Sequence, residues 1–103
     1  MGTLVYEKTT IFEFDARALT HLEAVIRAKL GRDEPFMMTV PTRPVDGSGR
    51  TSVWVNRDTA LVFKFRGPRV PLNHDWFRAL LAAANSPAGL SVVPEPIAAV
   101  DRA

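Results

Sequence analysis

Residues 50–66, RTSVWVNRDTALVFKFR, form the best-patterned stretch of the chain. Side chains alternate across a β-strand with a period of two residues. Residues 50–56 and 60–66 both follow this alternation, so each segment has one apolar face. Between them, residues 56–59 (NRDT) are of types typical of a turn. The pattern predicts two antiparallel strands joined by a tight turn, which is a half-buried β-hairpin.

The two faces of this predicted hairpin differ in chemistry. The apolar face carries Thr51, Val53, Val55, Leu61, Phe63 and Phe65. The other face would bring Trp54 together with three cations, Arg50, Lys64 and Arg66. Nucleic acids bind to such surfaces because cations neutralise phosphates and bases stack on aromatic rings. The alternative is that a helix covers this face, in which case Trp54 is a core residue and the cations pack at its edge.

Positive charge is concentrated in and around the predicted hairpin. The formal net charge of the chain is only +2, but residues 43–69 hold six basic side chains against two acidic ones. The segments before and after this block each carry a net charge of −1. A small global charge therefore allows an appreciable local field. Arg43 and Arg69 flank the hairpin, and the candidate nucleic-acid-binding residues are Arg50, Trp54, Lys64, Arg66, Arg43 and Arg69.

The bulk properties predict one soluble domain. A length of 103 residues leaves too little buried surface for two separate cores. Cysteine is absent, which excludes disulfides, thiol nucleophiles and cysteine-based zinc sites. No apolar run approaches the roughly 18 residues needed to span a bilayer, and the opening MGTLVYEK lacks the features of a secretion signal. We expect a cytoplasmic protein with no membrane partner.

The periodicity along the chain predicts an α+β fold. The expected elements are strands at 3–7, 10–14 and 35–40, a helix at 16–30, the two hairpin strands, a helix at 73–85 and a last strand at 89–93. Asp15 and Asn73 stand where helix N-caps belong, and Gly31 would end the first helix. The prediction is a single small domain with element order ββαβββαβ, a mainly antiparallel sheet and two helices.

The remaining organisation follows from the same pattern. On the first helix, the apolar residues share one face, which places Arg17, His21, Arg27 and Lys29 on the outer side. The proline- and glycine-rich residues 41–49 predict a mobile loop. We expect the domain to occupy residues 1–94 and to be followed by a flexible tail at 95–103.

Residues suited to catalysis or metal binding are few. His21 is expected on a helix surface, and His74 stands beside Asp75 at the start of the second helix, where a histidine is more often structural than catalytic. Two histidines without cysteine argue against a zinc site. The loop at 46–50 (DGSGR) lacks the spacing of a phosphate-binding loop and precedes a strand instead of a helix. We expect no catalytic residue, no metal and no cofactor.

Three segments resemble a known family. They are TLVYEKTTIFEFDARALTHLEAVIRAKL, GSGRTSVWVN and PLNHDWFRALLAAANSPAGLSVVPEP. The chain is similar, nearly throughout, to short actinobacterial proteins that genome annotation often labels "ATP-dependent DNA ligase", and the resemblance implies a link to DNA. Ligases of that class attack ATP with the lysine of a Lys-x-Asp-Gly motif. Here Pro44 occupies the lysine position before Asp46 and Gly47, and Lys64 lacks this context. We therefore do not carry over ligase activity.

Two functional hypotheses follow from the sequence. The first is a non-catalytic binding domain that contacts nucleic acid through the basic, aromatic hairpin face. The alternative is a protein-interaction or homodimerisation module, in which the apolar strand at 36–40 (FMMTV) is an edge that pairs with a partner.

Overall fold

The computed structural model describes residues 1–41 and 49–96 of the chain. Its elements are β1 (Gly2–Tyr6), β2 (Thr10–Phe14), α1 (Ala16–Gly31), β3 (Phe36–Pro41), β4 (Arg50–Val55), β5 (Leu61–Phe65) and α2 (His74–Ala84). The α+β class and the order of these seven elements are confirmed. The predicted last strand at 89–93 is reduced to one parallel bridge between Leu90 and Met38. Most of the predicted loop at 41–49 lies outside the described residues.

The first two strands form a tight hairpin. The pairing of β1 with β2 runs from Gly2 opposite Phe14 to Tyr6 opposite Thr10. Glu7 and Lys8 both have positive φ angles, 52° and 70°, and the Thr9 N–H donates to the Tyr6 carbonyl over 3.3 Å. Two consecutive positive φ angles give a turn whose twist matches that of the flanking strands. The turn therefore fixes the register of this hairpin.

The predicted pairing of residues 50–55 with 61–65 is wrong, although both strands and the turn between them exist. The Thr59 N–H donates to the Asn56 carbonyl over 3.0 Å, as expected for the turn. β4 then pairs with β3, whereas β5 pairs with β1 in a separate sheet of order β2-β1-β5. Glu7 stabilises the pairing of β5 with β1. Its N–H donates to the Ala60 carbonyl, and its carboxylate accepts from the Ala60 N–H.

The pairing with β1 also serves the core. It places Phe63 opposite Leu4, on the face of the sheet that also carries Phe12. Leu4 and Phe12 are buried, and Phe63 packs against them. A hairpin between β4 and β5 would leave the second edge of β1 without hydrogen-bond partners. Five paired positions on β1 and a shared apolar face explain why β5 leaves its neighbour in the chain.

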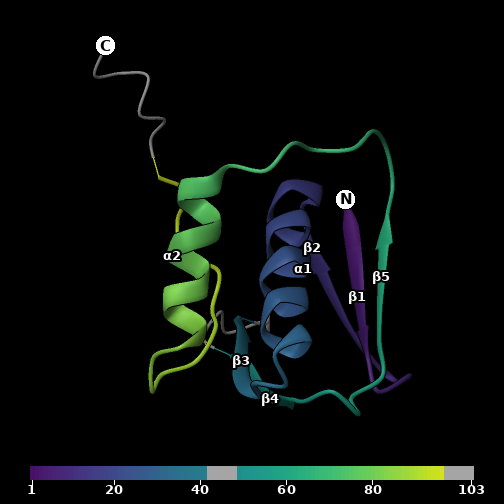
Figure 1. Ribbon diagram of the computed structural model, residues 1–103. Helices are drawn as coiled ribbons and strands as arrows, with labels where there is room; N and C mark the ends of the chain where they lie inside the picture. Colours follow the sequence, from purple (N-terminus) through teal and green to yellow (C-terminus); the bar gives the residue numbers. More distant parts are fainter. Residues whose placement is uncertain (42–48, 97–103) are drawn as a thin grey trace.

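Helix α1 lies between the three-stranded sheet and α2, so both helices are on the same side of that sheet and α1 is the one that packs on it (Figure 1). As predicted, Arg17 and Arg27 on α1 are exposed. The prediction was wrong for His21 and Lys29, which are 0% and 6% exposed. The apolar periodicity indicated one buried face, but α1 has two because α2 covers the second.

Both helices begin at the predicted caps. The Asp15 carboxylate accepts from the Ala18 N–H over 2.7 Å. The Asn73 side-chain oxygen accepts from the N–H groups of Asp75 and Trp76 over 3.0 and 3.3 Å. These bonds satisfy amides that have no partner within the helix.

The segment after α2 completes the second edge of β3. The Leu90 N–H donates to the Met37 carbonyl, and the Thr39 N–H donates to the Leu90 carbonyl, both over 2.8 Å. Gly89 makes this approach possible. Its φ is +86°, and a Cβ at this position would lie 2.6 Å from the Met37 carbonyl oxygen. Only glycine fits both the conformation and the space.

We expect Gly89→Ala to destabilise the protein more than Gly67→Ala. Gly67 also has a positive φ, +92°, but nothing lies within 4 Å of the position that a Cβ would take there. Gly67→Ala should therefore cost only the backbone strain, about 1–3 kcal/mol. Gly89→Ala adds a clash with the Met37 backbone. Urea unfolding followed by circular dichroism measures both losses, and equal losses would contradict the role given to Gly89.

Candidate functional site

Trp54 stands on the outer face of the two-stranded β3–β4 sheet. It is 49% exposed, so the alternative in which a helix covers it does not apply. Its register partner on β3 is Met37, which is 37% exposed. The next pair, Thr39 and Ser52, shares a hydrogen bond of 2.8 Å between the two hydroxyl groups. We call these four side chains, Met37, Thr39, Ser52 and Trp54, the Trp54 face.

The edge of β4 beside this face has no neighbouring strand in the part of the chain that the structure describes. In an antiparallel strand, the N–H and C=O of a residue point to the same side. Met37 and Thr39 direct theirs toward Leu90, away from β4. Their partners Trp54 and Ser52 must therefore direct theirs away from β3. In residues 1–41 and 49–96, the free edge of this sheet is therefore on β4, and not on the FMMTV strand that the sequence suggested.

One main-chain group on this open edge, the Trp54 carbonyl, has a side-chain partner. The Tyr6 hydroxyl donates to the Trp54 carbonyl over 2.6 Å and so joins the two sheets. Within residues 1–41 and 49–96, no backbone partner meets the Trp54 N–H or the two main-chain groups of Ser52. Unpaired groups of this kind on an edge strand can pair with an added strand.

The predicted cations do not gather around Trp54. Arg50 lies on β4 and points to the same side as Trp54, because the two are four residues apart. Lys64 lies on the other sheet, in register with Thr3. Arg66 follows β5, where its N–H donates to the Met1 carbonyl over 3.2 Å. Arg43 lies outside the described residues. Among the predicted cations that the structure describes, Arg50 alone lies on the same side of the β3–β4 sheet as Trp54.

Arg69 lines a groove elsewhere in the molecule. This hollow, of about 600 Å³, is lined by α1, by β5 and by the segment that connects β5 to α2. Phe63 and Phe65 form part of its wall, and Glu23 and Arg27 of α1 approach each other to 3.3 Å at its side. The groove combines apolar and charged walls, but it is separate from the Trp54 face.

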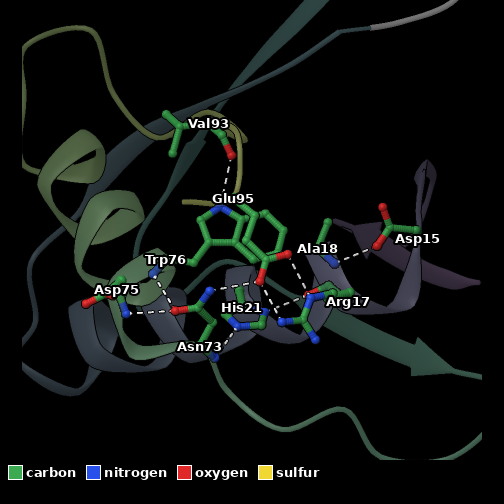
Figure 2. A network of polar contacts seen from close by, with 9 residues as sticks. All are labelled: Asp15, Arg17, Ala18, His21, Asn73, Asp75, Trp76, Val93 and Glu95. Carbon is green, nitrogen blue, oxygen red and sulfur yellow. Dashed lines mark hydrogen bonds and ion pairs between the residues drawn. The ribbon is translucent and has the colours of Figure 1, made fainter. Parts of the chain in front are cut away.

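A polar network with the buried residues His21 and Trp76 at its centre ties α1, α2 and the C-terminal segment together (Figure 2). At its centre, His21 Nδ1 lies 2.7 Å from the Arg17 carbonyl oxygen and Nε2 lies 2.8 Å from the Asn73 nitrogen. A carbonyl only accepts and an amide N–H only donates, so Nδ1 carries the proton and Nε2 accepts. Both ring nitrogens of His21 are used, and its buried ring offers no site for proton transfer to a substrate.

The same network holds Glu95. Arg17 donates to its two carboxylate oxygens over 2.8 and 2.5 Å, and the Asn73 amide donates over 2.9 Å. These bonds, first that from Arg17 and then that from Asn73, lower the pKa of Glu95 to about 2. The bond to Glu95 raises the pKa of Arg17. Residue 95, which was expected to start a flexible tail, is thus fixed to α1.

Trp76 closes this network from α2. Its indole is buried, with its ring centre 4.6 Å from that of His21. Its Nε1–H donates to the Val93 carbonyl over 2.9 Å. A buried indole usually needs such a partner for its N–H. The network is therefore a structural attachment that holds residues 93–95 against both helices.

Lys29 forms a second polar attachment, near the C-terminal ends of the two helices. Its Nζ donates to Glu34 Oε1 over 3.2 Å and to the side-chain oxygen of Asn85. A cation is favourable there, because unpaired carbonyls give a helix C-terminus a partial negative charge. Lys29 and Asn85 line a hollow of about 440 Å³, together with Glu34, Arg32, Ala28 and Leu81. The Lys29 ammonium is already occupied by protein partners.

His74 and Asp75 do not form a catalytic pair in a cleft. His74 is exposed, Asp75 is ion-paired with Arg78, and neither residue lines the two hollows described above. In the part of the chain that the structure describes, no three His, Asp or Glu side chains converge as metal ligands. In that part, too, no helix has the length and apolar character needed to cross a bilayer.

In the described residues, fold and site define a small α+β domain that presents an open strand edge and holds its C-terminal segment by polar bonds from both helices. The chain belongs to the family described as Domain of unknown function (DUF7882), whose model matches residues 1–95. No curated protein and no solved structure matches the chain. The resemblance to proteins labelled as DNA ligases stays a prediction.

Trp54 was a candidate from the sequence, but the side chains beside it were not. The exposed position of Met37 was available from the alternation in β3, in which Phe36, Met38 and Val40 are the buried members. The Tyr6 bond to Trp54 joins two sheets and leaves no local pattern. Glu95 also lacked a signal, because its partners are far away in the sequence.

We expect Glu95→Gln to flatten part of the acid dependence of stability. The folded pKa of Glu95 is about 2 against an ordinary value of 4.5. A carboxylate with a lowered folded pKa stabilises the fold above its unfolded pKa, and this contribution disappears as the pH falls through the folded value. The difference in unfolding free energy between wild type and Glu95→Gln should therefore shrink as the pH falls from 4.5 to about 2. Urea unfolding at several pH values measures it.

The matched variant for this experiment is Arg17→Met. It removes the main cause of the lowered pKa but keeps the carboxylate. In a protein that carries Arg17→Met, the part of the pH dependence of the unfolding free energy that is due to Glu95 should be smaller, because Glu95 then loses its strongest partner. A difference that stays constant from neutral pH down to the folded pKa would contradict the role of the ion pair.

Proposed function

We propose that this chain is a non-catalytic binding domain that takes an extended peptide segment of a partner protein along the open edge of β4. The single observation that carries the proposal is the half-exposed Trp54 beside unpaired main-chain groups on the same strand. An extended peptide can add to such an edge, where main-chain hydrogen bonds provide affinity.

The side chains of the Trp54 face suit this mode. In an added strand, alternate side chains point to the same face of the sheet. They would therefore lie beside Trp54 and Ser52. Trp54 offers a large ring with little conformational entropy to lose, and Met37 adapts to different shapes. Because Trp54 and Met37 are apolar and exposed, we expect the domain to prefer peptides with apolar residues at alternate positions.

The experiment is selection from a library of random linear peptides displayed on phage, followed by affinity measurements on the enriched sequences. We expect Trp54→Ala to weaken binding by about thirtyfold, the effect of truncating a central interface residue. Binding should also shift the amide resonances of Ser52 and Trp54 in an NMR titration. His74→Ala, an exposed change on α2, is the matched control. Peptides that bind Trp54→Ala as tightly as wild type would contradict the proposal.

Nucleic acid is the second candidate, favoured by Arg50 on the same side of β4 as the exposed indole. A base stacked on Trp54 would contribute about 1–3 kcal/mol. The predicted contributions of Lys64, Arg66, Arg69 and Arg43 belong to this proposal too. Since Lys64 lies on the other sheet, the proposal rests mainly on Arg50 and Trp54.

Fluorescence anisotropy with labelled single- and double-stranded DNA separates the two candidates. If the second holds, DNA binding weakens steeply as salt is raised, because phosphate contacts release counterions. Trp54→Ala and Arg50→Ala should each weaken it, whereas Lys8→Ala at the β1–β2 turn should not. Absence of DNA binding in low salt at tens of micromolar protein would remove this candidate.

No catalytic step belongs to the proposal. Lys64 was considered above as a possible ligase nucleophile. It lies in register with Thr3 on an exposed sheet face and not in a cleft. A nucleotidyl-transferring lysine needs surrounding groups that bind the phosphates of ATP. A cytoplasmic location, expected from the lack of cysteine, is also part of the proposal.

A further inference from the structure

The outer face of the three-stranded sheet carries two ordered rows of side chains. Each row takes one residue from β2, one from β1 and one from β5. The apolar row is Ile11, Val5 and Val62, and the polar row is Glu13, Thr3 and Lys64. We call these six residues the outer sheet face. Its acidic and basic members lie on opposite edge strands, at the same height, and the Thr3 hydroxyl between them donates to Glu13 over 3.2 Å.

This face is uncovered in the part of the chain that the structure describes. Helix α1 packs against the other side of the sheet, and α2 lies beyond α1 on that same side (Figure 1). Ile11 is 61% exposed and Val62 is 48% exposed, and both are β-branched residues that pack well on a pleated surface. A three-stranded sheet normally buries at least one face, and α1 already covers the first. Within the described residues, the second face presents apolar side chains to solvent.

We propose that the outer sheet face binds the same face of a second copy of this chain, related by a two-fold axis that runs along β1. Sheets that pack face to face keep their strands within about 30° of one another. In a two-fold dimer, the same patch serves both partners, so it must be complementary to itself. The order acidic, neutral, basic across the three strands has this property.

Two two-fold axes are possible in the plane of the interface, one along β1 and one perpendicular to it, and the charges favour the axis along β1. Rotation about β1 exchanges the two edge strands and keeps each row at its height. Glu13 then faces Lys64 of the second copy, and Ile11 faces its Val62. Rotation about the perpendicular axis keeps each strand in place and exchanges the rows, which sets Glu13 and Lys64 against apolar residues. Only the first arrangement pairs both charges.

The size of the face predicts a weak dimer. Standard interfaces bury about 800 Å² on each partner, and six side chains on three short strands provide less. The two ion pairs lie at the rim, where they direct the arrangement more than they add affinity. We therefore expect a dimer in exchange with its monomer, detectable by sedimentation velocity at high protein concentration.

The test reverses one charge at a time in the full chain. With Lys64→Glu, both edge strands of each copy carry an acidic residue, so carboxylates face carboxylates at both contacts. Glu13→Lys does the same with ammonium groups. Each single variant should raise the dissociation constant of the dimer about tenfold or more, since two attractive contacts become repulsive. Lys8→Glu alters the net charge by the same amount as Lys64→Glu but lies at the turn, outside the face, so it should leave the constant unchanged.

Two rescue experiments distinguish this dimer from any other. The double variant with Glu13→Lys and Lys64→Glu restores both pairs and should return the dissociation constant to that of wild type. A mixture of the two single variants should form a heterodimer, because one copy then presents two acidic and the other two basic residues. Circular dichroism of each variant checks that the fold is kept, and any variant that fails it is replaced by Ile11→Ser, which should weaken the dimer without a charge change.

Three results would overturn the proposal. They are a wild-type protein that stays monomeric at several hundred micromolar in low salt, charge reversals that leave the dimer intact, and a double variant that is not rescued. A dimer lost on Trp54→Ala but unaffected by the charge reversals would assign self-association to the β4 edge instead. A partner other than a second copy would leave the wild type monomeric. Because the two surfaces are separate, failure here leaves the proposed function standing.

Discussion

Helix α1 has two buried faces, and this constraint shapes most of the molecule. One face packs on the three-stranded sheet and the other on α2. Among the buried residues of α1, two are polar, His21 and Lys29. Such side chains need partners, because an unpaired polar atom in the core costs about 1–3 kcal/mol. His21 and Lys29 find theirs in Asn73 and in Glu34 and Asn85, and the described residues contain no buried side-chain nitrogen or oxygen without a partner.

The arrangement of helices on one side also explains why two surfaces stay open. With α1 and α2 together on one side of the β2-β1-β5 sheet, the second side has no helix to cover it in the described part of the chain (Figure 1). Leu90 pairs with one edge of the two-stranded β3–β4 sheet, whereas the other edge has no neighbouring strand among the described residues and only the Trp54 carbonyl is bonded, by Tyr6. Small domains bury a limited fraction of their surface. The binding proposal and the dimer proposal concern these two uncovered parts.

Local patterns in the sequence predicted local structure well. The caps Asp15 and Asn73, the turn at residues 56–59 and the alternation within β4 were all confirmed, because each depends on neighbouring residues. The pairing of β5 with β1 was not predictable in the same way. It depends on a free edge near the start of the chain, and a tight turn between two strands favours their pairing without enforcing it. The predicted site was wrong for the same reason, because Trp54 and Lys64 were placed on one face by the predicted pairing of β4 with β5.

The parallel bridge between Met38 and Leu90 has a consequence for how the chain forms on the ribosome. The edge of β3 can be complete only after residues 89 and 90 have left the exit tunnel, when β4, β5 and α2 have already been made. Until then, an apolar strand with unpaired main-chain groups is exposed in the nascent protein. Chains released early, before Gly89, would keep that edge open and would be prone to aggregation. The short segment after α2 thus protects a strand that was synthesised long before it.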